Sequence, residues 1–142
     1  MKVGDIMTAP AISIQADESA EIAARTLTHY NIGILPVCDK AGKLCGLLTD
    51  RDLVIRCVAS GHIPAQTKVK DIMSARVTSV SPETEAATAA EIMGSQQVRR
   101  LPVAENGILR GIVSLGDLAK QQESTSKAAG ALARISRNTG SF

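Results

Sequence analysis

The sequence predicts an α+β fold of two β-α-β-β-α repeats, packed with pseudo-twofold symmetry, in which small mixed sheets carry the helices. One observation behind this prediction is a duplicated opening, since Val3–Thr8 (VGDIMT) returns 66 positions later as Val69–Ser74 (VKDIMS). Another is the block GLLTDRDL at 46–53, which returns 65 positions later as GIVSLGDL at 111–118. The offset falls by one within the preceding turn, and turns tolerate length changes that strands do not. The two copies are therefore related structural units.

Each element of the repeat follows from local pattern. In the first copy we expect a strand at 11–14, a helix at 18–30 capped by Asp17 and ended by Gly33, strands at 34–38 and 44–48, and a helix at 50–60 capped by Thr49. In the second we expect a strand at 77–80, a helix started by Ser81-Pro82-Glu83, strands at 100–104 and 108–113 joined by Asn106-Gly107, and a last helix capped by Ser114. Pro36 inside its strand predicts an edge or bulge position.

These elements divide the chain into two repeats with a connector and a tail. The predicted boundaries are 1–61 for repeat 1, 62–68 for the connector, 69–120 for repeat 2 and 121–142 for the tail. Each repeat is about half of a 142-residue chain, too small to be stable alone, so we expect the two to fold against each other. In the tail, segment 128–135 can extend a helix, and 136–141 is expected to be disordered.

Composition excludes several classes of protein. Aromatic residues make up only 1% of the chain and the net charge is +2, so a nucleic-acid surface of basic and stacking side chains is not expected. No run approaches 18 apolar residues, and the first residues lack the apolar stretch of a signal peptide. We therefore expect no membrane partner and a cytoplasmic location.

Both copies place a hydroxyl residue and an aspartate at the start of the closing helix. These pairs are Thr49 with Asp52 and Ser114 with Asp117. A helix start favours an anion, and an acidic residue at such a place can accept both hydroxyls of a ribose, so the pair fits a 5′-phosphorylated nucleoside. The alternative is an ordinary capping box, in which the same two side chains satisfy their own main chain. Repetition in register favours the ligand-binding interpretation.

The duplicated set of motifs resembles a tandem pair of cystathionine-β-synthase (CBS) domains over about residues 3–120. The residues that carry it are the D-I-M openings, the strands Leu35-Pro36-Val37 and Leu101-Pro102-Val103, and the endings that contain Thr49 and Ser114. The blocks Thr49-Asp50-Arg51-Asp52 and Gly61-His62-Ile63-Pro64 are similar to those of small stand-alone bacterial pairs, which include the hypoxic-response proteins.

The resemblance implies a non-catalytic regulatory protein that needs no cofactor. Such pairs bind AMP, ADP, ATP or S-adenosylmethionine between the repeats and form homodimers, and a separate effector protein would respond to the ligand. For the phosphate and ribose it implies Thr49, Asp52, Ser114, Asp117, Arg99, Arg100 and Arg51. For adenine it implies Met7, Ala11 and Ile12 beside Asp117, and Met73, Val77 and Thr78 beside Asp52.

The two implied sites differ in charge. Arg99 and Arg100 stand where the first copy has Gly33 and Ile34. The Asp117 site then has a guanidinium available for a phosphate, whereas the Asp52 site must rely on Arg51 or the helix end. We therefore expect the Asp117 site to bind a phosphorylated nucleotide more tightly than the Asp52 site. The alternative for the arginines is a solvated pair of charges.

Two other functions stay open at this point. Cys38 and Cys45 flank the hairpin of the first copy and, facing each other, would suit a metal- or redox-responsive stress protein, although their spacing is not that of a zinc site. The second alternative is a structural dimerisation module that binds no ligand. The sequence contains no nucleophile elbow, Walker loop or Ser-His-Asp set, so we expect no enzyme.

Overall fold

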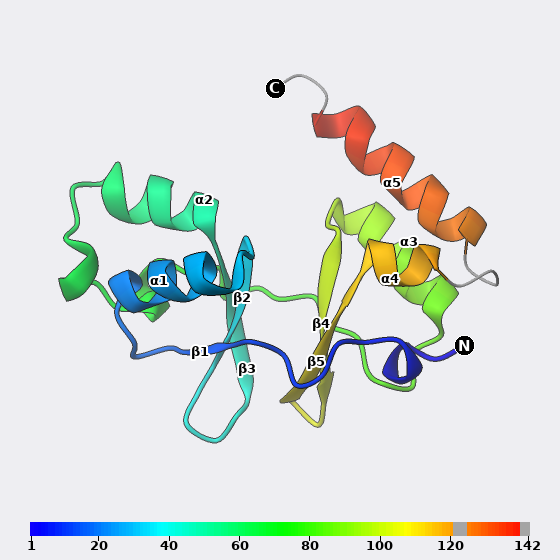
Figure 1. Cartoon of the computed structure of the whole chain (residues 1–142), viewed down its shortest axis with the longest axis horizontal. Helices are drawn as coiled ribbons and strands as arrows, with labels where there is room; N and C mark the ends of the chain where they lie inside the picture. Colours follow the sequence, from blue (N-terminus) through cyan, green and yellow to red (C-terminus); the bar gives the residue numbers. More distant parts are fainter. Residues whose placement is uncertain (121–124, 140–142) are drawn as a thin grey trace. The chain divides into compact units, whose positions relative to one another are not determined.

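The computed structural model describes residues 1–120 and 125–139 of the chain (Figure 1). The chain divides into two compact units. Unit 1 contains Met1–Ala11, Thr78–Asn106 and the described residues from Arg110 onward, whereas unit 2 contains Ile12–Val77 and Gly107–Leu109. Each unit thus combines most of one repeat with the opening segment of the other.

Unit 2 is built on a three-stranded mixed sheet in the order β1 (Ile14–Gln15), β2 (Ile34–Cys38) and β3 (Leu44–Thr49). β1 runs parallel to β2, and β2 runs antiparallel to β3. The other elements of the unit are α1 (Ala20–Tyr30), α2 (Asp50–Asp52), the π-helical η2 (Leu53–Val58) that continues it, and the 3-10 turns η3 (Pro64–Gln66) and η4 (Val69–Asp71). Its core includes Leu35, Leu48 and Cys57 together with Val69 and Ile72 of the second opening.

Unit 1 repeats this plan around the hairpin of β4 (Arg100–Glu105) and β5 (Ile108–Ser114). The elements around it are η1 (Val3–Asp5), α3 (Ala86–Gln96), α4 (Leu115–Ala119) and α5 (Thr125–Thr139). A single parallel bridge between Val80 and Val103 stands where unit 2 has β1. The core joins Val3 of the first opening to Met93, Leu101 and Leu118. The α+β prediction of small mixed sheets and helices is confirmed.

The first helix of each repeat starts and ends at other residues than the sequence predicts. α1 is capped by Ser19, whose hydroxyl oxygen accepts from the Ile22 amide at 3.1 Å, and not by Asp17. Asp17 instead forms an ion pair with Lys70 at 3.2 Å. At its other end, α1 stops at Tyr30, and Asn31, with a left-handed φ of 52°, is the C-cap in place of the predicted Gly33.

The start of repeat 2 also differs from the prediction. The expected strand at 77–80 is reduced to the bridge at Val80, and α3 begins at Ala86, not after Ser81. The amide of Ser81 donates to the Thr84 hydroxyl at 3.1 Å, and the Thr84 amide donates to the Ser81 carbonyl at 3.1 Å. These two bonds close a turn, so the helix starts one turn later.

Pro36 lies in β2, the middle strand of its sheet, so the prediction of an edge strand is wrong. The predicted bulge lies close to the proline. β1 pairs only with Val37 and Cys38, just beyond the proline, which has no N–H to donate. The register between β2 and β3 shifts between Val37 and Cys38. In the other hairpin, Asn106 and Gly107 have φ values of 53° and 80°, as the predicted two-residue turn requires.

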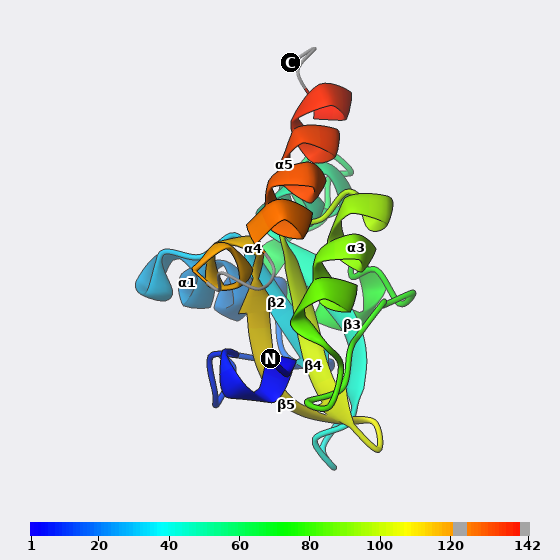
Figure 2. The same ribbon diagram turned by 90° about the vertical axis from the view of Figure 1, so that its right-hand side faces the viewer.

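Much of the tail is helical. α5 extends beyond both ends of the expected helical segment 128–135 and includes 136–139 of the segment expected to be disordered, while 140 and 141 lie outside the described residues. It packs on α3 and α4 (Figure 2), with Ala131 and Ile135 in the core of unit 1. In the described part of the chain, no helix is long and apolar enough to cross a membrane.

Candidate functional site

The hydroxyl–aspartate pairs form complete capping boxes in both units. In unit 1 the Asp117 amide donates to Ser114 Oγ at 3.0 Å, and the Ser114 amide donates to Asp117 Oδ2 at 2.9 Å. In unit 2 the corresponding bonds, between Asp52 and Thr49, measure 3.1 and 2.9 Å. One carboxylate oxygen of each aspartate is therefore held by its own main chain, as the structural alternative requires. Oδ1 of each carboxylate and the hydroxyl hydrogens lie outside the box.

The opening segments lie across glycines of the closing strands. The amide of Thr8 donates to the Ile112 carbonyl at 2.8 Å, and the Ile112 amide donates back at 3.0 Å. A Cβ on Gly111 would stand 2.6 Å from the Thr8 carbonyl oxygen, so only glycine permits this approach. In unit 2, Ser74 exchanges the same two bonds with Leu47, at 2.9 and 3.0 Å, beside Gly46.

This exchange of openings distributes the predicted adenine residues between the units. Met7 and Ala11 belong to unit 1 with Asp117, and Met73 and Val77 belong to unit 2 with Asp52. Ile12, predicted beside Asp117, lies in unit 2, and Thr78, predicted beside Asp52, lies in unit 1. Four of the six predicted residues thus share a unit with their carboxylate.

A cavity of about 500 Å³ in unit 1 brings the predicted phosphate residues together. Its lining residues are Arg99, Arg100, Ser114, Leu115, Gly116, Ala119, Ala129 and Leu132. The carbonyl of Arg99 accepts from the Leu115 amide at 2.7 Å, which fixes the arginine pair beside the start of α4. Both arginines are exposed, and Asp117 is not part of the lining. The cavity therefore offers guanidinium groups and a hydroxyl to an anion.

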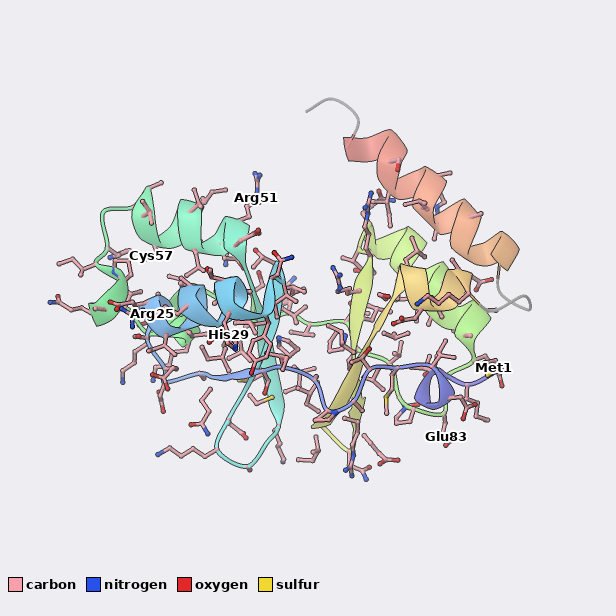
Figure 3. The ribbon with its side chains drawn as sticks, in the orientation of Figure 1. Met1, Arg25, His29, Arg51, Cys57 and Glu83 are labelled. Carbon is pink, nitrogen blue, oxygen red and sulfur yellow. The ribbon has the colours of Figure 1, made fainter. Side chains whose placement is uncertain are left out.

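In unit 2, the start of the closing helix has a carboxylate where unit 1 has Leu115. Asp50, which corresponds to Leu115, accepts from the Arg51 amide at 2.8 Å through Oδ1, and its carboxylate lies beside Gly33. The Arg51 side chain is exposed and points away from α2 (Figure 3). An anion at this helix start would meet the negative charge of Asp50.

Arg56 links Asp52 to the second opening segment in unit 2. Its Nε lies 3.8 Å from Asp52 Oδ1, and its Nη1 donates to the Met73 carbonyl at 3.1 Å and to the Ile72 carbonyl at 3.4 Å. Sequence reasoning missed this residue, although its i, i+4 spacing from Asp52 on a helix indicates the contact. Ala129 and Leu132 were also missed, because no local pattern places a tail at a cavity.

Burial disfavours the thiolate form of the two cysteines in the first hairpin. Burial raises the pKa of the Cys38 thiol, and burial together with the charge of Asp39 raises that of Cys45. Cys45 Sγ lies 3.4 Å from the Val37 carbonyl oxygen as a weak donor. Within residues 1–120 and 125–139, no group of three or more His, Cys, Asp or Glu side chains is arranged to hold a metal ion. The described residues give the metal- or redox-responsive alternative no support.

A family model described as "CBS domain" matches residues 3–58 and again residues 69–124. The chain belongs to the CBS-domain family. It is a CBS pair, as the duplicated motifs predicted. The second match ends at residue 124, so α5 lies outside the family repeats.

Similar proteins support this assignment. The CBS domain-containing protein YhcV of Bacillus subtilis is 38% identical over 134 residues, which cover 94% of this chain and 94% of that protein. The crystal structure of Hypoxic Response Protein I with two coordinated zinc ions has 31% identity and a TM-score of 0.79, and the match covers 85% of this chain and 98% of that one. The CBS domain pair of MJ0100, in complex with 5-methylthioadenosine and S-adenosyl-L-methionine, has 26% identity and a TM-score of 0.73, covering 84% and 94% of the two chains.

Proposed function

We propose that this CBS pair is a non-catalytic regulatory protein that binds an adenine nucleotide in unit 1. The observation that carries the proposal is the cavity that Arg99, Arg100 and Ser114 line together. The MJ0100 pair, a relative in fold, binds adenosyl compounds, which supports this ligand class. Two guanidinium groups at one cavity favour a phosphate, because arginine pairs with phosphate oxygens through parallel hydrogen bonds.

The charge of the cavity favours AMP, ADP or ATP over S-adenosylmethionine. The sulfonium of S-adenosylmethionine is positive and would be repelled by Arg99 and Arg100, whereas each added phosphate is attracted. In this proposal the phosphates contact the arginines and the hydroxyl of Ser114. Asp117 Oδ1, which the capping box leaves unused, accepts from the ribose hydroxyls, and Met7 and Ala11 contact the adenine.

Unit 2 is proposed to bind phosphorylated ligands weakly or not at all. Asp50 places negative charge at the start of its closing helix, and Arg56 bridges Asp52 to the second opening. The zinc ions of Hypoxic Response Protein I have no ligand set among the described residues here, so a metal-dependent role is not favoured.

The proposed response to the ligand is a change in the population of two conformations of the pair. A nucleotide shifts such an equilibrium only by its difference in affinity for the two states. We propose that the protein acts as a homodimer and that a separate effector protein recognises the nucleotide-bound state.

A thermal-shift panel with AMP, ADP, ATP and S-adenosylmethionine tests the proposal. A ligand that binds only the native state raises the melting temperature, so the phosphorylated nucleotides are expected to stabilise the protein and S-adenosylmethionine to have the smallest effect. No stabilisation by any of the four compounds contradicts the proposal and favours the structural dimerisation module.

Asp117→Ala and Asp52→Ala locate the site by calorimetry. Each substitution removes the carboxylate half of its capping box and leaves the bond to the hydroxyl in place, so each is expected to cost about 1 kcal/mol of stability. Only Asp117→Ala is expected to lose most of the nucleotide affinity. Equal affinity of the two variants would contradict a site in unit 1.

A further inference from the structure

The C-terminal helix α5 belongs to the wall of the proposed site, although it lies beyond the family repeats. It is held on α3 through Ala131 and Ile135, which are 2% and 4% exposed. The close approach depends on Gly94 of α3, since a Cβ there would stand 3.2 Å from both Cα and Cβ of Ala131 and 2.9 Å from Arg134 Nη1. The helix is thus seated on unit 1 at a defined place.

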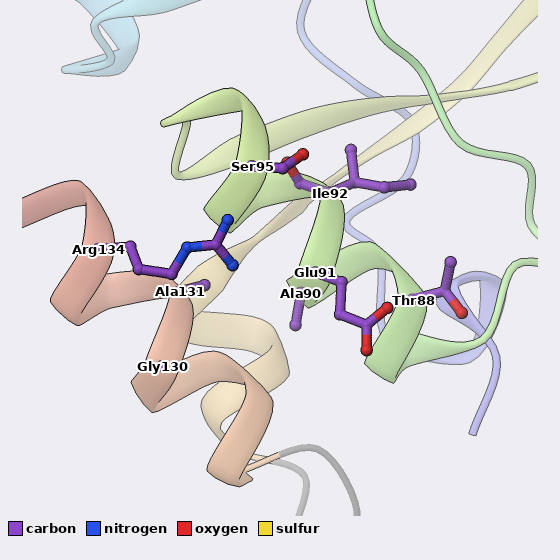
Figure 4. A pocket seen from close by; sticks show the side chains of 8 residues that line it. All are labelled: Thr88, Ala90, Glu91, Ile92, Ser95, Gly130, Ala131 and Arg134. Atoms are coloured by element: carbon purple, nitrogen blue, oxygen red, sulfur yellow. The ribbon is translucent and has the colours of Figure 1, made fainter.

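Two hollows flank this helix. On one side, Gly130, Ala131 and Arg134 face α3 across an open groove, with Glu91 and Ser95 on its far wall (Figure 4). On the other side, Ala129 and Leu132 line the cavity that contains Arg99 and Arg100. Because 129 and 132 are three residues apart, one helix face supplies both contacts.

Leu132 is a large apolar side chain left 42% exposed beside two guanidinium groups. An inorganic anion would use only the arginines and leave this surface in water. A nucleotide carries both kinds of surface, since its phosphates are charged and its base and ribose have apolar faces. The cavity wall is therefore complementary to a ligand with an anionic end next to an apolar body.

We infer that α5 is the apolar wall of the nucleotide site, with Leu132 and Ala129 burying the base or ribose of the bound nucleotide. Docking of α5 on α3 and binding of the nucleotide then stabilise each other, because the ligand contacts the helix only when the helix is seated. The seating of α5 on α3 then becomes the feature that reports nucleotide binding. This inference rests on the proposed function.

Calorimetric titration of the full chain with ATP tests the contact at Leu132. Leu132→Glu removes apolar surface and places a carboxylate next to the phosphates, so the Kd is expected to rise at least about tenfold. Ala133→Glu is the matched control, since Ala133 is an exposed neighbour on α5 that is not part of the cavity lining. Its Kd is expected to stay within about twofold of the unmodified chain, a difference well below a tenfold change.

A second pair tests the coupling through residues that do not themselves line the cavity. Gly94→Leu forces α5 away from α3 and is expected to raise the Kd at least about tenfold, as the loss of Leu132 does. Gly130→Ala is its control, because a Cβ there meets nothing within 4 Å and alanine strengthens the helix. This control is expected to bind ATP at least as tightly as the unmodified chain.

The outcomes separate the inference from the function on which it rests. ATP binding by the unmodified chain with an unchanged Kd in Leu132→Glu overturns the role of α5 and leaves the proposed function standing. If the unmodified chain binds neither AMP nor ATP, the proposed function fails and this inference fails with it. Should Gly94→Leu not fold, Leu132→Glu still decides, since its side chain is partly exposed and outside the core.

Discussion

Unit 1 and unit 2 have the same hydrogen bonds at the end of the repeat: two within the capping box and two between the opening segment and the closing strand. The residues around the two boxes, however, differ in charge. In unit 1 the turn is Ser114-Leu115-Gly116 with Arg99 and Arg100 beside it. In unit 2 the turn contains Asp50, and the positions of the arginines are taken by Gly33 and Ile34. The duplication has kept the hydrogen bonds that build the fold and varied the groups that a ligand would meet.

The elements that follow the two closing helices differ as well. In unit 2 the connector packs η3 against α1, whereas in unit 1 α5 packs on α3 and α4. Arg56 links Asp52 to the opening segment in unit 2, and its counterpart, Gln121, lies outside the described residues. The capping box is common to both units, so the proposal of a ligand site in unit 1 depends on the side chains around the box.

The largest expected effect on stability is at the glycines under the opening segments. Gly111→Ala is expected to lower the free energy of unfolding by about 3 kcal/mol, because the new Cβ meets the main-chain oxygen of Thr8 at 2.6 Å. Gly46→Ala is expected to cost roughly half as much, because its nearest neighbour is the flexible Met73 side chain. Urea denaturation measures both, and a larger loss in Gly46→Ala would contradict the difference between the units.

The next effect is on ATP affinity. Arg99→Gln replaces the guanidinium with a shorter, neutral amide, and is expected to weaken ATP binding by about 1.5–3 kcal/mol, the strength of a charged hydrogen bond. Arg51→Gln is the control in unit 2 and is expected to leave the affinity unchanged. Calorimetry decides, and equal losses in the two variants would mean that general surface charge, not the unit 1 cavity, attracts ATP.

Arg56 gives a smaller effect that is confined to stability. Arg56→Ala removes the bonds to Met73 and Ile72 and the contact with Asp52, and, because the side chain is half exposed, about 1 kcal/mol is expected. Arg25→Ala removes only the exposed pair with Glu21 and is expected to cost roughly 0.3 kcal/mol. The two denaturation midpoints provide the measurement. A loss of ATP affinity in Arg56→Ala would contradict a ligand site restricted to unit 1.

The smallest effect is the pH dependence of the ion pair between Asp17 and Lys70. The hydrogen bond and charge of Lys70, with the charge of Lys68, lower the pKa of Asp17 below the ordinary value of an aspartate. A carboxylate with a depressed folded-state pKa stabilises the fold above its unfolded pKa, and this stabilisation is lost as the pH falls through the folded pKa. Asp17→Asn should therefore be slightly less stable than the unmodified chain at pH 7 and equally stable at low pH. A deficit that persists in acid would indicate a role other than charge.

Features determined by neighbours in the chain could be predicted from the sequence. The caps at Thr49 and Ser114 and the Asn106-Gly107 turn depend on hydrogen bonds and dihedral angles within a few residues, and all three were predicted correctly. The duplicated motifs also predicted the α+β fold and the family. These signals are local or repeated, and a single sequence contains both.

Features determined by distant partners could not be predicted in the same way. Ser19 caps α1 in place of Asp17, and the segment 16–20 around this cap is held by main-chain bonds to residues 67–70, far along the chain. The first strand is short because its partner β2 has Pro36 next to the paired residues. Arg56 and Leu132 lie near the closing turns only through tertiary contacts, which no local pattern predicts. The alignment of the copies did predict the charge difference at Arg99 and Arg100.

The most direct measurement is an NMR titration of the full chain with ATP, followed at the backbone amides. If the nucleotide binds in unit 1, the largest shifts occur at Arg99, Arg100, Gly116 and Leu132, which line one cavity, while the amides of Thr49 to Asp52 stay close to their starting positions. Shifts that are equal at the two closing turns, or larger at Asp52, would contradict the account.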